Sequence, residues 1–365
     1  MSTTRFIALS GFLGSGKTTA MLAAAQKLES KGRKVAVITN DQAGNLVDTS
    51  MAARQTTTMG EVTGGCFCCR FNDLMDVTAR LLGDGVDTVI AESVGSCTDL
   101  QATIIRPLLA QYDEFCVSPL TTIVDPARVI AFSRATHSGK TTDLVYLFQR
   151  QLLDAEMIAI SKADMYSQSF LDEARAAIEK MAPGKRILTY SAVTGDGLDG
   201  LLDAWEGQAI FGDHDLEVDY DRYATAEAQL AWGNAVLVVK AAEPFTLPDW
   251  TEAFLSYISK ECDERDYAIG HVKVLLRSSN AIVKGALINA GQPPSVAVYS
   301  TALQAESAEV TINARVSAPP VGLDTLVQAG INHAALITGA YCDEVGLASF
   351  QPGYPTPTHR ILVAN

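Results

Sequence analysis

The octapeptide from Gly11 to Thr18, GFLGSGKT, constrains the fold of this chain more than any other feature of its sequence. It follows the apolar run Phe6–Ser10 and precedes a helical pattern that extends from Lys17 to about Lys31. Glycines at this spacing let backbone N–H groups curl around phosphate oxygens, and the start of the following helix adds positive potential. The sequence therefore predicts a phosphate-binding loop between a buried strand and a helix.

The residues of this loop have individual predicted roles. Lys17 is expected to reach the β- and γ-phosphates, Thr18 to place its hydroxyl on Mg²⁺, and Thr19 to contact the α-phosphate. The residues expected to bind the nucleotide here are Gly14, Ser15, Gly16, Lys17, Thr18 and Thr19. A second GKTT at Gly139–Thr142 lacks the upstream glycine and follows no β run, so no phosphate binding is expected there.

Apolar runs alternate with helical patterns over residues 1–210. Unbroken Val/Ile/Ala runs are typical of strands buried on both faces, with helices as the crossovers of a parallel sheet. The six predicted strands are Phe6–Ser10, Lys34–Thr39, Thr88–Ala91, Thr121–Val124, Met157–Ile160 and Arg186–Tyr190. We expect a P-loop NTPase domain with a mostly parallel, doubly wound α/β sheet.

The pattern changes near Gly212. Residues 211–228 contain an acid at nearly every second position from Asp213 to Asp221, which favours an exposed acidic linker over metal capture by His214. Residues 229–365 are expected to form a smaller α+β domain with a mostly antiparallel sheet. Its predicted elements are Ala235–Val239, a helix at Trp250–Ser259, Gly270–Leu276, Ala281–Asn289, Glu309–Val316 and a helix at Leu323–Thr338.

Composition narrows the choice of partners and compartment. The 365 residues are 48% hydrophobic and 19% charged, and 42 acids against 28 bases give a net charge of −14. Such a chain repels phosphate backbones and anionic lipid, so neither nucleic acid nor a membrane is an expected partner. The apolar start ends in Lys17-Thr18-Thr19 rather than in a cleavage site, and the seven cysteines form no spread disulfide framework. We therefore expect a cytoplasmic protein with reduced thiols.

Hydrolysis also needs groups beside the γ-phosphate. Glu92 ends a predicted strand, where it can hold Mg²⁺ through water or orient the attacking water, and Gly95 can offer its N–H to the γ-phosphate. Asp41 follows the second strand on the same rim of the sheet. Asp41 is thus a catalytic candidate, although Asn-Asp pairs are also ordinary turn formers.

Two further strand ends indicate which base is read. Ser161-Lys162-Ala163-Asp164 is similar to the guanine-reading NKxD element, with serine in place of asparagine. Asp164 would accept hydrogen bonds from guanine N1–H and N2, and Lys162 would lie over the base. Ser191 and Ala192 open a loop whose backbone N–H would contact guanine O6. Together these elements favour GTP over ATP.

A cluster of thiols is unusual for a plain nucleotide hydrolase. Cys66, Cys68 and Cys69 lie within the six residues GGCFCC, and thiolates are soft ligands suited to Zn²⁺. Water, a carboxylate or a partner protein would fill the fourth position. Buried cysteines that act as small hydrophobes and a redox dithiol are the alternatives. Without a turn the adjacent Cys68 and Cys69 would not both face one ion, so two ligands from the three are also conceivable.

These motifs together resemble the CobW-type GTPases, relatives of the nickel-insertion GTPases UreG and HypB. The resemblance is carried by GFLGSGKTT, GGCFCC, ESVG at Glu92–Gly95, SKAD at Ser161–Asp164, and Ser191-Ala192. It covers the first ~205 residues and departs at Asp41-Gln42, where the family has Glu-Phe. Asp41 keeps the charge on a shorter arm.

The resemblance implies slow, metal-responsive GTP hydrolysis that delivers zinc, cobalt or another transition metal to a client metalloprotein. It also allows a homodimer, because this class of P-loop GTPase often works as a dimer. Two other functions remain open from the sequence. One is a GTP-dependent accessory protein that assembles or reactivates a corrinoid or other cofactor enzyme, and the other is a regulatory switch that binds metal without delivering it.

Overall fold

The computed structural model describes residues 3–40, 47, 58–137, 142–210 and 217–362. Contacts divide the chain into two compact units. The first comprises Met1–Gly44, Asp48–Ala226 and Tyr354–Asn365, and the second comprises Asn45–Val47 and Glu227–Gly353. From the sequence pattern, residues 354–365 were expected to belong to the second domain. The structure groups them with the first unit because the amides of Thr358 and Ile361 bond to carbonyls of that unit.

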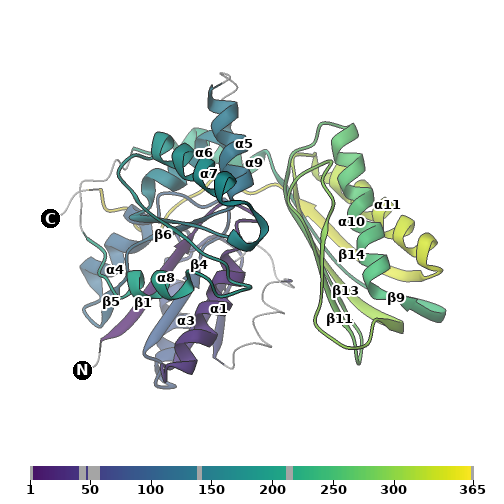
Figure 1. The fold of residues 1–365 in the computed structure, drawn as a ribbon, viewed down its shortest axis with the longest axis horizontal. Coiled ribbons are helices and arrows are strands. Elements are labelled where there is room, and N and C mark those ends of the chain that lie inside the picture. The colour runs from purple at the N-terminus through teal and green to yellow at the C-terminus, as the bar shows by residue number, and fades with distance from the viewer. Residues whose placement is uncertain (1–2, 41–46, 48–57, 138–141, 211–216, 363–365) are drawn as a thin grey trace. The chain divides into compact units, whose positions relative to one another are not determined.

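The first unit contains an eight-stranded sheet (Figure 1). Seven strands have the order β3-β2-β4-β1-β6-β7-β8, and β5 pairs with the N-terminal residues of β1. The strands are β1 Thr4–Ser10, β2 Val35–Asn40, β3 Met59–Val62, β4 Thr88–Glu92, β5 Phe115–Val117, β6 Thr121–Val124, β7 Met157–Ile160 and β8 Arg186–Thr189. All of these pairs are parallel. The expected parallel α/β domain is therefore confirmed, with β3 and β5 as additional strands.

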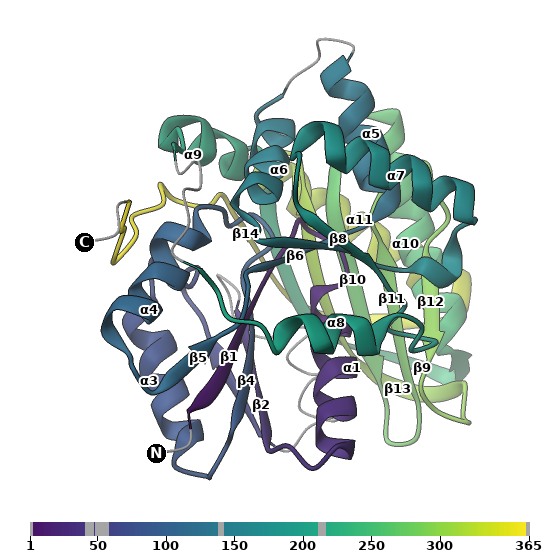
Figure 2. The same cartoon turned by 60° about the vertical axis from the view of Figure 1, so that its left-hand side comes forward.

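Helices cover both faces of this sheet. They are α1 Lys17–Ser30, α3 Phe71–Leu82, α4 Arg106–Gln111, α5 Pro126–His137, α6 Asp143–Asp154, α7 Gln168–Met181, α8 Leu198–Trp205 and α9 Tyr220–Ala228, with a π turn at Gln101–Ile105 and a 3₁₀ turn at Ala163–Met165. Figure 2 shows α1 and α8 on the same side of the sheet, where Trp205 joins Ile7 and Leu9 in one buried cluster. On the other face, the Thr122 hydroxyl donates to Gln151 O of α6 at 3.0 Å. Because parallel strands place their carboxyl ends on one edge, the loops that follow β1, β2, β4 and β7 meet there.

The second unit contains a six-stranded antiparallel sheet with the order β12-β11-β10-β13-β9-β14. Its strands are β9 Ala231–Thr246, β10 Ile269–Arg277, β11 Ile282–Leu287, β12 Ser295–Val298, β13 Gln304–Val316 and β14 Tyr341–Phe350, and its helices are α10 Leu247–Glu264 and α11 Pro320–Thr338. The predicted α+β fold with an antiparallel sheet is confirmed. Part of the predicted linker, residues 220–228, is helical, and His214 lies outside the described residues.

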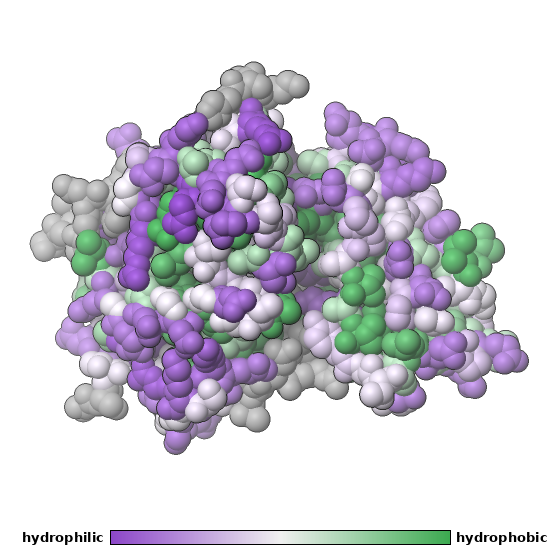
Figure 3. Space-filling view, in the orientation of Figure 1, coloured by the Kyte–Doolittle hydropathy of each residue, from purple (hydrophilic) through white to green (hydrophobic). Residues whose placement is uncertain are grey.

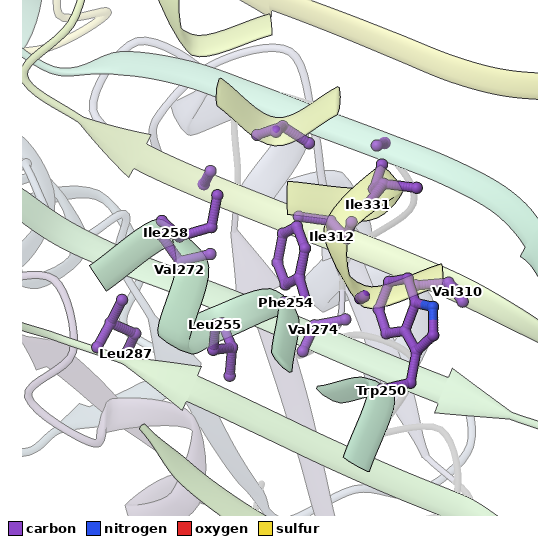
Figure 4. Close-up of a cluster of buried hydrophobic side chains, with 14 of the residues drawn as sticks. Trp250, Phe254, Leu255, Ile258, Val272, Val274, Leu287, Val310, Ile312 and Ile331 are labelled. Atoms are coloured by element: carbon purple, nitrogen blue, oxygen red, sulfur yellow. The ribbon is translucent and has the colours of Figure 1, made fainter. Parts of the chain in front are cut away.

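The core of the second unit lies between its two helices and one face of its sheet. Trp250 and Phe254 of α10 stack with centroids 5.6 Å apart, in the same buried cluster as Val272 and Val274 of β10 (Figure 4). Full burial of an aromatic or aliphatic side chain contributes about 1.5–3 kcal/mol relative to exposure. The surface of this unit also carries hydrophobic side chains (Figure 3), and Leu336 of α11 is 79% exposed.

Across the described part of the chain, the structure contains no helix with the length and apolar character needed to cross a bilayer.

Candidate functional site

The phosphate loop begins directly after β1 and ends at the first turn of α1. Gly11 has φ 139°, and a Cβ there would lie 2.2 Å from Ile123 O, so only glycine fits. Gly16 precedes α1 in the left-handed region, at φ 95°. The Lys17 ammonium donates to Gly11 O at 2.6 Å and to Phe12 O at 3.4 Å. These bonds hold the cation over the loop, where phosphate oxygens would meet it.

The predicted magnesium residues are in contact. The Thr18 hydroxyl donates to both carboxylate oxygens of Glu92, at 3.0 and 2.9 Å, and both side chains are buried. Oxygen donors of this kind suit Mg²⁺, so the two residues fit the ion. Gly95 lies against the phosphate loop, because a Cβ there would stand 2.9 Å from Leu13 N. The loop after β4 therefore packs directly on the phosphate loop.

The predicted base-reading elements lie together. Lys162, in the left-handed region at φ 59°, donates to Gly14 O at 3.0 Å and to Asp125 Oδ2 at 2.6 Å. The Ser191 hydroxyl donates to Asp164 Oδ1 at 2.6 Å. The stem of Lys162 thus lies beside the phosphate loop, and the Asp164 carboxylate is oriented by Ser191.

Three other predicted nucleotide-site residues have distinct positions. The Ser161 hydroxyl, which replaces the asparagine of NKxD, donates to Ser15 O at 2.7 Å and so ties this element to the phosphate loop. Ala192 is partly buried beside the α1 and α8 cluster, and Thr19 is exposed on α1. Asp41 lies outside the described residues, so its catalytic role stays a prediction.

The three cysteines of GGCFCC surround one point. The loop from β3 to α3 makes a tight turn, in which the amides of Cys69 and Arg70 both donate to Cys66 O, at 3.0 and 2.9 Å. This turn brings Cys66 Sγ within 2.8 Å of Cys68 Sγ and 3.4 Å of Cys69 Sγ, and the last two sulfurs are 3.8 Å apart. The turn that the adjacent cysteines require is therefore present.

A fourth cysteine, Cys97, reaches the same cluster. The Sγ atoms of Cys66, Cys68 and Cys97 all lie within 4.8 Å of one another, and all three side chains are buried. Cys97 is located in the loop that follows Glu92, a different segment from the GGCFCC motif. Cys97 was not among the ligands expected from the sequence.

Hydrogen bonds shift the pKa values of these thiols in opposite directions. The pKa of Cys66 lies well below its ordinary value because its hydrogen bonds with the thiols of Cys68, Cys69 and Cys97 favour the thiolate form. The pKa of Cys68 lies well above its ordinary value because its hydrogen bond to Cys66 favours the protonated form. The same kind of bond raises the pKa of Cys69 to about 11. Cys66 is therefore the first thiol of the cluster to lose its proton.

Asn40, the last residue of β2, fixes the cysteine loop. Its amide nitrogen donates to Val62 O at 3.0 Å and to Gly65 O at 2.8 Å. Its carbonyl oxygen accepts from Phe67 N at 2.9 Å. One buried side chain thus holds both ends of the turn that carries Cys66.

Two residues of α6 hold the loop that carries Cys97. The Gln151 amide donates to Gly95 O at 3.0 Å and to Cys97 O at 2.8 Å. Asp154 accepts from Leu100 N at 2.6 Å. Burial raises the pKa of Asp154 to about 7.

The C-terminal segment spans both cysteine-bearing loops. Thr358 donates its amide to Cys68 O at 2.8 Å and its hydroxyl to Cys69 O at 3.1 Å. Arg360 pairs with buried Asp99 at 2.7 Å, two residues beyond Cys97. The yellow C-terminal segment runs beside elements of the first unit in both Figure 1 and Figure 2.

This geometry accompanies a sequence match over residues 5–189 to the nucleotide-binding domain model of the CobW/HypB/UreG family. The chain belongs to this family. The zinc chaperone YjiA of Escherichia coli (strain K12) is 30% identical over 198 residues, which are 53% of this chain and 59% of that protein. The zinc chaperone CobW of Pseudomonas aeruginosa is 27% identical over 48% of this chain and 53% of its own length. The chain thus spans about half the length of these curated relatives.

Among solved structures, nickel-bound HypB from Helicobacter pylori aligns with a TM-score of 0.40 and 19% identity, over 55% of this chain and 85% of that one.

The phosphate loop and the GGCFCC motif of this CobW/HypB/UreG member could be found from the sequence. The residues that connect the two sites were missed. Cys97 had a detectable signal, since it stands just after the ESVG segment on the same sheet edge as the other candidates. Asn40 also had one, because it directly follows the predicted strand Lys34–Thr39 and precedes Asp41. Thr358 had none: its partner Cys69 is 289 residues away in the chain.

Proposed function

We propose that this chain is a GTP-hydrolysing metallochaperone, which couples the binding and hydrolysis of GTP to the binding and delivery of a transition metal. One observation carries the proposal: a single short loop joins the phosphate site to the thiol cluster. Glu92 at its start contacts Thr18, and Cys97 further along lies among the other thiols. A nucleotide that reorganises this loop must act on the thiols.

In the proposed hydrolysis, the chain's own groups bind and orient the nucleotide. Backbone amides of the glycine loop and the Lys17 ammonium would hold the β- and γ-phosphates, with Gly95 N–H on the γ-phosphate. Thr18 and Glu92 would hold Mg²⁺, which neutralises charge developing on the phosphate oxygens. Asp164 and Lys162, beside the loop, are the groups proposed to select guanine.

The proposed cargo is a thiophilic metal ion, and zinc is the simplest choice. Thiolates bind Zn²⁺, Cu(I) and, less tightly, cobalt, whereas magnesium and calcium prefer oxygen. The two curated relatives named above are both zinc chaperones, which supports zinc without fixing it for this chain. The receiver would be a client metalloprotein. We place this exchange in the cytoplasm, where thiols stay reduced.

Thermodynamic linkage provides the test. If GTP changes metal affinity by some factor, the metal must change GTP affinity by the same factor. Zinc affinity would be measured by competition with a chromophoric chelator, for protein that is nucleotide-free, GDP-bound or bound to a non-hydrolysable GTP analogue. We expect affinities that differ at least about fivefold between the two nucleotide states. Cys66→Ser should lose tight zinc binding and keep nucleotide binding. Equal zinc affinity in all three states would contradict the proposal.

A further inference from the structure

The position of Cys97 has a consequence beyond nucleotide-coupled metal binding. We propose that Cys97 is the fourth thiolate ligand of the metal, and that it is the ligand through which the nucleotide controls release. The inference rests on the proposed function, since it names the group through which that function would be regulated. It assigns a closed site of four thiolates, Cys66, Cys68, Cys69 and Cys97, to a thiophilic cation such as Zn²⁺.

The sulfur positions suit one tetrahedral ion. Zn–S bonds of about 2.3 Å in a tetrahedron separate the sulfurs by about 3.8 Å. Cys69 Sγ already lies 3.8 Å from Cys68 Sγ and 3.4 Å from Cys66 Sγ. The 2.8 Å between Cys66 and Cys68 would open by about 1 Å around such an ion. Cys97 Sγ lies within 4.8 Å of Cys66 Sγ and Cys68 Sγ in a group of three that does not include Cys69, so Cys69 and Cys97 would have to approach each other around the ion to complete the set.

The backbone around Cys97 links it to the γ-phosphate position. Cys97 N donates to Val94 O at 3.0 Å, which closes a tight turn over Gly95. Gln151 donates to the carbonyls of both Gly95 and Cys97, so one side chain connects these two residues. Gly95 in turn packs against the phosphate loop at Leu13. A shift of Gly95 toward a γ-phosphate would therefore shift Cys97 relative to the other three thiols.

The other three cysteines have a different attachment. Their loop is fixed to β2 by Asn40, through both Val62 and Gly65, and to the C-terminal segment by Thr358. The loop that carries Cys97 is held by Gln151 and Asp154 of α6, and the C-terminal segment reaches it through a different residue, Arg360, which pairs with Asp99. Asn40 thus supports the segment with three of the ligands, and α6 supports the segment with the fourth. Such an arrangement can change from four thiolates to three without dismantling the cluster.

Cobalt substitution tests the ligand number directly. Co²⁺ bound to the 365-residue protein absorbs in the visible and near-ultraviolet with intensities that increase with the number of thiolates. Wild type with GDP should show the spectrum of four thiolates, and Cys97→Ser that of three. The matched control is Cys116→Ser, a half-buried thiol of β5 outside the cluster, which should match wild type. Loss of a direct ligand should weaken zinc binding at least as much as loss of an outer-shell partner, about 10–100-fold.

The nucleotide dependence separates this inference from the proposed function. A GTP analogue should change the Co²⁺ spectrum of wild type and leave that of Cys97→Ser unchanged. A variant that still responds to the analogue would overturn the role of Cys97 and leave nucleotide coupling intact. A wild type that shows four thiolates but no response would overturn the coupling instead.

X-ray absorption on zinc-loaded wild type needs no variant and guards against misfolding of Cys97→Ser. Four sulfur neighbours are expected, and three sulfurs with one oxygen or nitrogen would contradict the assignment.

Discussion

The phosphate loop and the thiol cluster of the first unit are built in opposite ways. The loop is one continuous segment between β1 and α1, and its lysine bonds to carbonyls five and six residues earlier. The thiols come from two segments, and their loops are held by Asn40, Gln151 and Thr358 from three more. A locally encoded site tolerates changes elsewhere in the chain. An assembled site depends on residues that never touch the metal.

This difference predicts where substitutions should act. Changes in the phosphate loop should abolish nucleotide chemistry and leave zinc binding by the empty protein in place. Changes in the supports of the thiols should weaken metal binding and leave the loop intact. Among the described residues, the segment from Glu92 to Cys97 belongs to both sites, so changes there should affect both.

The largest expected effect is that of Lys17→Ala on hydrolysis. The substitution removes the cation that would neutralise the γ-phosphate in the transition state, and loss of one such donor lowers kcat by about 10²–10³-fold. Zinc affinity without nucleotide should stay within twofold of wild type. Phosphate release with saturating GTP measures the first effect, and chelator competition the second.

Lys140→Ala provides the control, because the second GKTT has the residues of the motif without its strand and glycine context. Equal loss of hydrolysis in both variants would show that the phosphate site is misassigned.

The contrast also accounts for what the sequence predicted. Six strands of the first unit and the phosphate loop could be predicted because each has a local sequence pattern. The strands have apolar runs, and the loop has its spacing of glycines. Strand β3 was missed because MGEV is neither apolar nor alternating, and β5 because it has only three residues. In the second unit, β9 extends over 16 residues, but only Ala235–Val239 gave a clear signal.

The candidate site divides along the same line. Thr18 and Glu92 could both be assigned to Mg²⁺ in advance, Thr18 from the phosphate-loop motif and Glu92 from its position at a strand end on the same edge of the parallel sheet. The contact of Cys97 with the other thiols depends on how two loops pack, and that packing is set by Gln151 and Asn40. The sequence that flanks a residue does not predict contacts of this kind.

Asn40→Ala should produce the next largest effect, on metal binding. The variant loses three hydrogen bonds to the cysteine loop, and loss of outer-shell partners lowers metal affinity by about 10–100-fold. Zinc competition measures the change, and GTP-analogue affinity in metal-free protein should stay near that of wild type. Asn40→Asp keeps only the acceptor for Phe67 N. Its zinc affinity, on a logarithmic scale, should be no higher than the midpoint between those of Asn40→Ala and wild type. Wild-type zinc affinity in Asn40→Ala would remove this residue as a support.

Asp154 should make the stability of the metal-free protein depend on pH. Burial, and next the charge of Asp99, raise its pKa to about 7, whereas an unfolded aspartate titrates near 3.9. Between these values the folded protein keeps a proton that the unfolded chain has lost, so unfolding free energy falls as pH rises from about 4 to about 7. Above pH 7 this loss is complete.

Asp154→Asn cannot ionise and should lack this dependence. The free energy of unfolding of the variant relative to wild type should therefore increase by about 2 kcal/mol between pH 5 and pH 7. Denaturant unfolding at both pH values measures it. Asp76→Asn, at an exposed carboxyl on α3, should show no comparable change. A pH-independent difference for Asp154→Asn would mean that this carboxyl is ionised throughout.

The smallest expected effect tests whether the C-terminal segment belongs to the thiol site. Thr358→Val removes the hydroxyl bond to Cys69 O and keeps the amide bond to Cys68 O, with nearly unchanged shape. One such bond contributes about 0.5–1.5 kcal/mol, so zinc should dissociate roughly two- to tenfold faster. Thr325→Val, which removes a similar hydroxyl bond at an exposed position of α11, should leave the rate unchanged. If Thr358→Val instead weakened GTP binding and zinc binding equally, the two sites would share their supports, and the contrast between a local and an assembled site would fail.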